Sequence, residues 1–260
     1  MTEHAAHRSR WPIVGAAGSG LLYVGLALAA LAAATGLLPV LLGVAAAVLG
    51  AGVLVAGLVG WLAEAFLGVR VTGESTPLYR QTMLLFLLTD VATFAAGFIY
   101  YAFIRAGAWP PADLPHGLLG VLVVANTGIL IASSVTFHLA ASALDDGNHT
   151  RFTRLLGLTF LLGVVFLGGQ ALEYVEFIHE GFTATSGVFA SAFYGLTALH
   201  GLHVALGTVL IGIVLWRARR GTYGPDRDTS VETVELYWHF VDVVWVILVV
   251  VLYAGATVGA

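Results

Sequence analysis

The sequence predicts an all-α, polytopic membrane protein with seven transmembrane helices. Of its 260 residues, 59% are hydrophobic and only 10% are charged, whereas soluble domains carry about 25% charged residues. Seven apolar segments are each long enough to cross a hydrocarbon core of about 30 Å. They cover residues 11–34, 38–62, 80–104, 117–142, 154–178, 187–216 and 234–257.

The first two segments are expected to form a hairpin, because only the short turn from Gly36 to Pro39 separates them. No polar stretch approaches the roughly 50 residues that an independent soluble domain needs. We therefore expect one domain overall, with a cytoplasmic tail over 1–10, a two-helix hairpin over 11–66 and a five-helix bundle over 67–260.

Arginine placement orients the helices, since cytoplasmic loops of membrane proteins carry an excess of basic residues. With the N-terminus in the cytoplasm and the C-terminus outside, only Arg105 lies on the outer side. The cytoplasmic flanks then hold Arg8, Arg10, Arg70, Arg80, Arg151, Arg154, Arg217, Arg219, Arg220 and Arg227. The expected location is the cell membrane.

Composition also excludes several classes of function. The chain has no cysteine, which rules out disulfides, thiolate metal sites and iron–sulfur clusters. A net charge of −4 offers no basic surface, so no nucleic-acid partner is expected. Nucleotide-binding motifs are absent, and no nucleophile stands beside a local base that would indicate a catalytic residue.

Glycines are spread through the apolar segments rather than gathered in linkers. Small residues allow membrane helices to approach closely. The glycines expected at helix contacts are Gly15, Gly18, Gly25, Gly43, Gly50, Gly57, Gly60, Gly163 and Gly207.

The last segment contains YWHFVDVVW, from Tyr237 to Trp245, which places polar groups inside an apolar helix. A charged group costs several kcal/mol in hydrocarbon unless it finds a partner. Trp238, Asp242 and Trp245 follow one stripe of the helix, and His239 lies three residues before Asp242. Such a face is expected to be buried within the bundle.

Other polar residues lie in the middle or at the ends of the apolar segments. Glu180 and His179 are interpreted as a solvated helix end, and His138 as an interfacial residue. Residues too deep for that interpretation are expected to have a functional or assembly role: they are Asp90, His203 and Asp242. A buried polar network is expected from Glu173, Glu176, His200, His239 and Asp242.

The same residues also include possible metal ligands. The HxxH, ExxE and HxxD patterns of the last three segments supply ligands that zinc or a di-iron centre would use. Their depths differ by tens of Å along the membrane normal, so no metal site is expected. Spacing leaves open a haem between His138 and either His200 or His203.

Six short motifs together resemble subunit III of the haem–copper oxidases, the cytochrome c and quinol oxidase family. SRWPIVGA resembles the family's SPWPLTGA, GEST its REST, EYVE its EYYE and HGLHVALGT its HGLHVIIGT. YWHFVDVVW is identical, and MLLFLLTDV is similar to a segment that ends in a buried glutamate, here Asp90. In family order they begin at Ser9, Gly73, Met83, Glu173, His200 and Tyr237.

The resemblance implies a noncatalytic subunit of a proton-pumping terminal oxidase, whose haem and copper are held by the partner subunit I, with subunit II in the same complex. The chain itself would bind no cofactor. It would stabilise subunit I, support proton uptake and hold membrane phospholipid in a cleft where helices 1–2 splay from the five-helix bundle 3–7.

By position, the resemblance implies a role in supporting proton uptake for Asp90, His203, His4 and His7. His203 is the expected partner of Asp90. The resemblance also implies lipid binding by Trp61, Glu74, His203, Arg217 and Arg220. From the residues alone, a transporter or channel is the main alternative; internal repeats typical of transporters are not evident. An accessory subunit of a nitric oxide reductase is a further alternative, disfavoured by the two extra N-terminal segments.

Overall fold

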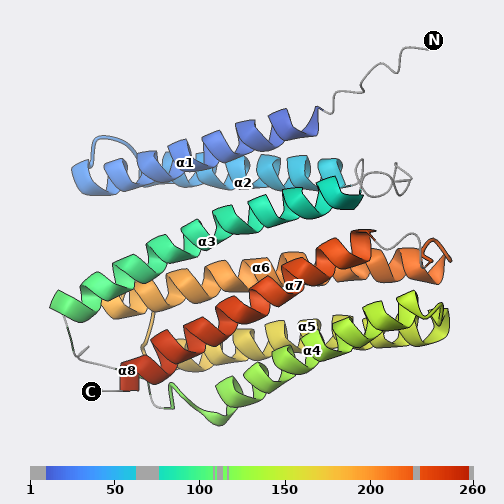
Figure 1. Ribbon diagram of the computed structural model, residues 1–260. Coiled ribbons are helices and arrows are strands. Elements are labelled where there is room, and N and C mark those ends of the chain that lie inside the picture. Colours follow the sequence, from blue (N-terminus) through green and yellow to red (C-terminus); the bar gives the residue numbers. More distant parts are fainter. Residues whose placement is uncertain are drawn as a thin grey trace. The chain divides into compact units, whose positions relative to one another are not determined.

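The structure is a computed structural model that describes residues 10–62, 76–107, 109, 114–115, 117–224 and 229–257. All regular elements within these residues are helical, and seven of the helices are long and apolar enough to cross a membrane, as expected (Figure 1). The chain divides into two compact units, Met1–Val71 and Thr72–Ala260.

The first unit contains α1 (Trp11–Thr35) and α2 (Val40–Leu62), which pack against each other as the predicted hairpin. Helix α1 ends at Gly36, whose φ of 68° is left-handed and whose N–H donates to the Ala32 carbonyl over 2.9 Å. Glycine suits this position because it lacks the Cβ that makes a left-handed backbone costly.

Glycines hold the hairpin closely packed. A Cβ on Gly18 would lie 2.7 Å from the Leu54 Cα, and one on Gly50 would lie 2.7 Å from the Leu22 Cα. The same close approach to the opposite helix occurs at Gly25, Gly43 and Gly57, while Gly60 faces the indole of Trp11. The expectation that these glycines mark helix contacts is confirmed, and Gly15 contributes its backbone opposite Gly57.

The second unit contains five long helices: α3 (Thr76–Gly107), α4 (Val121–Asp145), α5 (His149–His179), α6 (Val188–Arg219) and α7 (Thr229–Leu248). Helix α7 packs against α3, α4 and α6, and α5 packs against α4 and α6. Helix α7 thus contacts three other helices, and it carries three of the largest fully buried side chains of this unit, Tyr237, Trp238 and Trp245.

The end of α7 continues as a π-helical turn, η3 (Val249–Ala254), followed by the short α8 (Gly255–Thr257). Helix α3 donates two hydrogen bonds to carbonyls in this region. The Tyr101 hydroxyl bonds the Val251 oxygen over 3.1 Å, and Arg105 Nη1 bonds the Gly255 oxygen over 2.7 Å. These bonds satisfy backbone carbonyls that hydrocarbon would leave unpaired.

The hairpin can be tested with two alanine substitutions on the same helix. Gly18→Ala is expected to destabilise the protein by about 1–3 kcal/mol, because its Cβ overlaps the α2 backbone. Gly20→Ala places its Cβ in open space, so it is expected to stabilise by about 0.5–1 kcal/mol through helix propensity. Thermal unfolding in detergent measures both, and equal effects would contradict the close contact.

Candidate functional site

Trp238 occupies a slot formed by three other helices. Its indole N–H donates to the Ser133 hydroxyl of α4 over 2.9 Å. A Cβ on Gly163 of α5 or on Gly207 of α6 would lie 3.0 or 2.7 Å from the indole carbons. The indole is fully buried, so one side chain joins four helices by packing and by a satisfied polar group.

Trp245, two helical turns further along, makes a second connection of the same kind. Its indole N–H donates to the Thr127 hydroxyl of α4 over 3.0 Å. The ring stacks on His200 of α6 with a centroid distance of 5.2 Å and meets Phe166 of α5 edge to face. His200 is 1% exposed, and neither of its ring nitrogens has a hydrogen-bond partner among the described residues.

Glu173 lies in a separate buried cluster at the other end of the unit. Its Oε2 accepts hydrogen bonds from Gln170 Nε2 over 2.6 Å and from the Tyr253 hydroxyl over 2.9 Å. Glu173 is only 3% exposed. The cluster therefore joins α5 to the π-helical turn through a carboxyl group with two donors.

Asp90 of α3 and His203 of α6 face each other across their helix contact. Asp90 Oδ2 lies 3.6 Å from His203 Nε2, and both side chains are about 15% exposed. His203 Nδ1 lies 2.8 Å from the Leu199 carbonyl oxygen. Because a carbonyl only accepts hydrogen bonds, Nδ1 carries a proton and Nε2 is the nitrogen left to face the carboxyl.

Helix α7 completes the surroundings of this pair. The Tyr237 hydroxyl donates to the His203 carbonyl over 3.1 Å, and the Tyr237 ring stacks on the imidazole at 19°. Phe94 of α3 also packs on the imidazole, with 5.1 Å between the two ring centroids. Aromatic rings from two helices thus fix the imidazole in front of Asp90.

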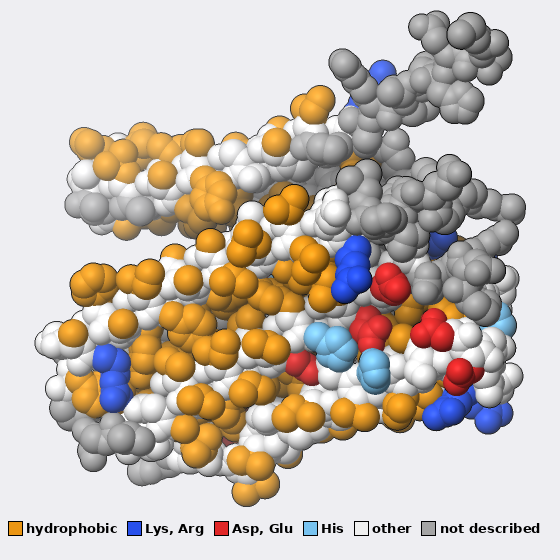
Figure 2. Space-filling model, viewed as in Figure 1, with side chains coloured by type: hydrophobic (Ala, Val, Ile, Leu, Met, Phe, Trp, Pro, Cys, Tyr) orange, Lys and Arg blue, Asp and Glu red, His pale blue; other side chains and the backbone are white. Residues whose placement is uncertain are grey.

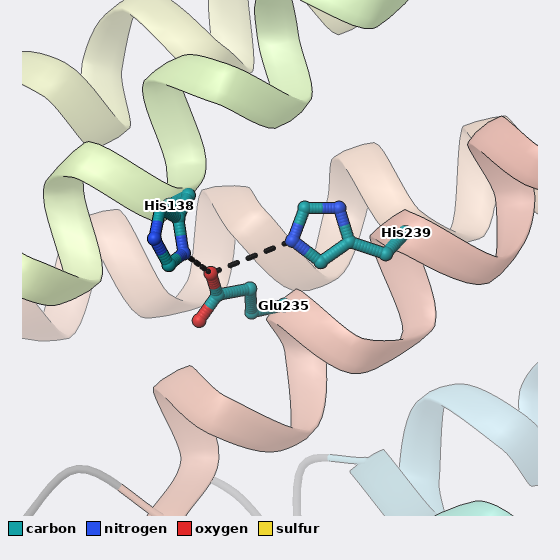
Figure 3. Close-up of side chains that lie close together, drawn as sticks. All are labelled: His138, Glu235 and His239. Atoms are coloured by element: carbon teal, nitrogen blue, oxygen red, sulfur yellow. Dashed lines mark hydrogen bonds and ion pairs between the residues drawn. The ribbon is translucent and has the colours of Figure 1, made fainter.

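A third cluster joins α4 to α7 (Figure 3). His138 Nδ1 lies 3.1 Å from Glu235 Oε1, and His239 Nε2 lies 3.5 Å from the same oxygen. Glu235 and His239 are one helical turn apart on α7, and His138 comes from α4. The interfacial interpretation of His138 did not include this partnership, and Glu235 was not singled out from the sequence.

The residues expected to form one buried polar network fall into separate groups in the structure. Glu173 and His200 are buried, Asp242 and His239 are half-buried, and Glu176 is exposed. Glu176 departs from the expectation because it is exposed. Residues three apart on a helix are rotated by about 60° from each other, and this rotation places Glu176 at the edge of the stripe that buries Glu173. Sequence reasoning also missed Gln170 and Tyr253, which are the actual partners of Glu173.

Arg217 and Arg220, both assigned to lipid binding, lie at the end of α6. The Arg220 guanidinium is 3.9 Å from the Trp216 ring, and that of Arg217 is 5.7 Å from the Tyr223 ring. Burial raises the pKa of Tyr223, although a hydrogen bond from Ser230 and the charge of Arg217 lower it. The Tyr223 phenol is therefore neutral at pH 7.

Trp61 is 43% exposed at the end of α2 and lines an apolar groove of about 460 Å³ within the hairpin, together with Trp11, Ser19 and Leu54. His4, His7 and Glu74 lie outside the residues that the structure describes.

A family model described as cytochrome c oxidase subunit III matches residues 2–257. The chain belongs to this family. The cytochrome c oxidase subunit 3 of Synechocystis is 41% identical over 174 residues, covering 66% of this chain and 73% of that protein. That of the rabbit, Oryctolagus cuniculus, is 33% identical over 96% of this chain and 95% of its own. A probable subunit 3 from Nocardia farcinica is 35% identical, covering 72% of this chain and 95% of its own.

Membership in the cytochrome c oxidase subunit III family makes the chain a noncatalytic, multi-pass membrane subunit of a haem–copper oxidase complex. The seven-helix architecture agrees with the resemblance noted in the sequence. Within this family frame, the helix contacts around α7 are internal to the subunit, whereas catalysis is a property of the whole complex.

The Glu173 cluster generates a stability prediction. Tyr253→Phe removes one of the two donors to a buried carboxyl group, so the protein is expected to lose about 1–3 kcal/mol. Tyr100→Phe, at a residue 46% exposed, is the control and is expected to change stability by less than about 0.5 kcal/mol. Thermal unfolding of the purified protein measures both. If Tyr253→Phe loses no more stability than Tyr100→Phe, the hydrogen bond between Tyr253 and Glu173 does not stabilise the protein.

Proposed function

We propose that this subunit supports oxygen reduction by a partner subunit I that holds haem and copper, stabilising it during turnover and assisting proton uptake. Subunit II completes the proposed complex. The observation that carries this proposal is the Asp90–His203 pair, a carboxyl and an imidazole held together inside membrane-spanning helices.

The pair is suited to hold one exchangeable proton. His203 Nδ1 is committed to the Leu199 carbonyl, so a proton between the two side chains sits either on Nε2 or on Asp90. With the proton on Nε2 the pair is an imidazolium and a carboxylate; with it on Asp90 the pair is neutral. A carboxyl and an imidazole are the side chains that most often relay protons within membranes.

Exposure supports access to this proton. Both side chains are about 15% exposed at the surface of the second unit, rather than sealed like His200. A proton could therefore pass between the pair and water or a titratable group on an adjoining subunit. Among the deep residues in the described part of the chain, only Asp90 and His203 combine a partner that can hold a proton with partial exposure of the side chain.

Lipid contact is the second part of the proposal. The Arg217 and Arg220 guanidiniums lie beside aromatic rings at the end of α6, a position suited to a phospholipid headgroup. The exposed Trp61 at the end of α2 is a residue type enriched at membrane interfaces. Arginine placement in the sequence supports a cytoplasmic N-terminus and a C-terminus outside.

Affinity purification tests the assembly directly. A tagged chain purified from its native membrane in mild detergent is expected to bring down a haem-bearing partner with visible absorption bands. The same tagged chain expressed without the partner genes is expected to show no haem absorption. Stoichiometric haem in the lone chain would contradict the noncatalytic assignment, and no haem in the native purification would contradict the partnership.

The proton-uptake role is tested with Asp90→Asn in the purified oxidase. We expect normal assembly but slower proton uptake or earlier inactivation during turnover, because asparagine cannot hold the shared proton. An effect of about 1 kcal/mol on the limiting step corresponds to about a fivefold change in rate.

His203→Gln should affect the same step, and the double variant should show less than the sum of both effects because the two residues act as one unit. Asp146→Asn, at an exposed position in the turn after α4, is the control and should behave as the unchanged protein. Unaltered proton uptake and lifetime in Asp90→Asn would reduce this residue to a structural group.

A further inference from the structure

We propose that His138, Glu235 and His239 form a binding site for a zinc-type divalent cation that bridges α4 and α7. The three side chains each offer one ligand atom, and these atoms all lie within 4.8 Å of one another. Neither the family assignment nor the proposed proton pair accounts for this triad.

The geometry suits a small tetrahedral cation. Zinc binds imidazole nitrogen and carboxylate oxygen at about 2.0–2.2 Å, which places neighbouring ligand atoms about 3.3 Å apart in a tetrahedron. The measured separations from Glu235 Oε1 are 3.1 Å to His138 Nδ1 and 3.5 Å to His239 Nε2. Both distances to Glu235 Oε1 are thus close to the tetrahedral spacing, and all three ligand atoms lie within 4.8 Å of one another.

The two helices preorganise the ligands. Glu235 and His239 are four residues apart on α7, so both side chains project from one face of the helix. His138 comes from the facing side of α4, and Figure 3 shows the two imidazoles converging on the same carboxylate oxygen. Two imidazoles and one carboxylate are a ligand set that zinc uses when a fourth position stays open.

The two imidazoles are not fully covered by other parts of the described chain. The side chains of His138 and His239 are 74% and 43% exposed, whereas Glu235 is 15% exposed. Figure 2 shows histidine and acidic side chains gathered on one face of the second unit, beside its apolar surface. His138 lies seven residues before the end of α4 at Asp145, or about 10 Å along the helix axis, which places the triad near the membrane interface rather than its centre.

The chemistry has a clear consequence for the fold. A cation held by ligands from α4 and α7 would cross-link these two helices near the end opposite the Glu173 cluster. In its absence the carboxylate accepts from the imidazoles, so the triad is stable without metal and binding is reversible. The ligand class is a borderline divalent transition metal, since imidazole and carboxylate together favour zinc over magnesium or calcium.

The test is zinc binding to the purified oxidase complex that contains this chain. After treatment with a chelator, the complex is equilibrated with Zn²⁺ in a zinc buffer and bound zinc is measured by mass spectrometry. We expect the unchanged complex to bind one zinc ion. In Glu235→Gln and in His138→Gln the zinc affinity should fall at least about tenfold, which is the lower end of the loss seen when even an outer-shell partner is removed.

His149→Gln and His179→Gln, at exposed histidines outside the triad, are the matched controls and should retain this zinc. An unchanged haem spectrum shows that each variant has assembled, and His138→Gln alters a surface side chain that is 74% exposed. X-ray absorption at the zinc edge should report two imidazoles among the ligands.

Equal zinc binding in the unchanged complex and in both triad variants would overturn the proposal. Zinc binding that is weakened by Glu235→Gln but not by His138→Gln would also overturn it, because the proposed site bridges two helices.

Discussion

The structure depends on one constraint: a polar side chain placed in the membrane is costly unless it finds a partner, and several of the partners lie on another helix. In hydrocarbon no water is present to satisfy an indole, a phenol or a carboxyl. Helix α7 meets this constraint by donating from Tyr237, Trp238 and Trp245 to α6 and α4. Its continuation donates from Tyr253 to Glu173 on α5. These bonds have only one correct register, so they fix the depth and rotation of α7.

Glycine placement makes this arrangement possible. The indole of Trp238 packs closely against α5 and α6 where Gly163 and Gly207 lack a Cβ. Glycines also allow α1 to pack closely against α2, where the backbones of Gly15 and Gly57 meet. Small residues thus give the close helix approach, while large aromatic residues of α7 supply directional hydrogen bonds.

The helices and their polar faces could be predicted from the sequence, but the pairs of side chains could not. Apolar length defined seven spans, and the cost of burying Asp90 and His203 marked them as residues that need partners. The partner of Glu173 is Tyr253, 80 positions away, and that of His138 is Glu235, 97 positions away. No local spacing encodes such contacts, because they depend on how α4, α5 and α7 pack.

The Asp90–His203 separation has a simple chemical origin. Aspartate is one methylene shorter than the glutamate expected from the family motif, and the distance of 3.6 Å is longer than a direct hydrogen bond. The rings of Phe94 and Tyr237 hold the imidazole in front of the carboxyl without a short hydrogen bond between the two side chains.

The central claim is that this subunit sustains oxygen reduction without holding a redox centre. The most direct test removes the chain from the purified oxidase with detergent and measures the haem spectrum, the initial rate of oxygen reduction and the number of turnovers before inactivation. The account predicts an unchanged spectrum, an initial rate equal to or lower than that of the intact oxidase, a shorter active lifetime, and recovery of that lifetime when the chain is added back. Loss of haem on removal of the chain, or an active lifetime that does not change, would contradict it.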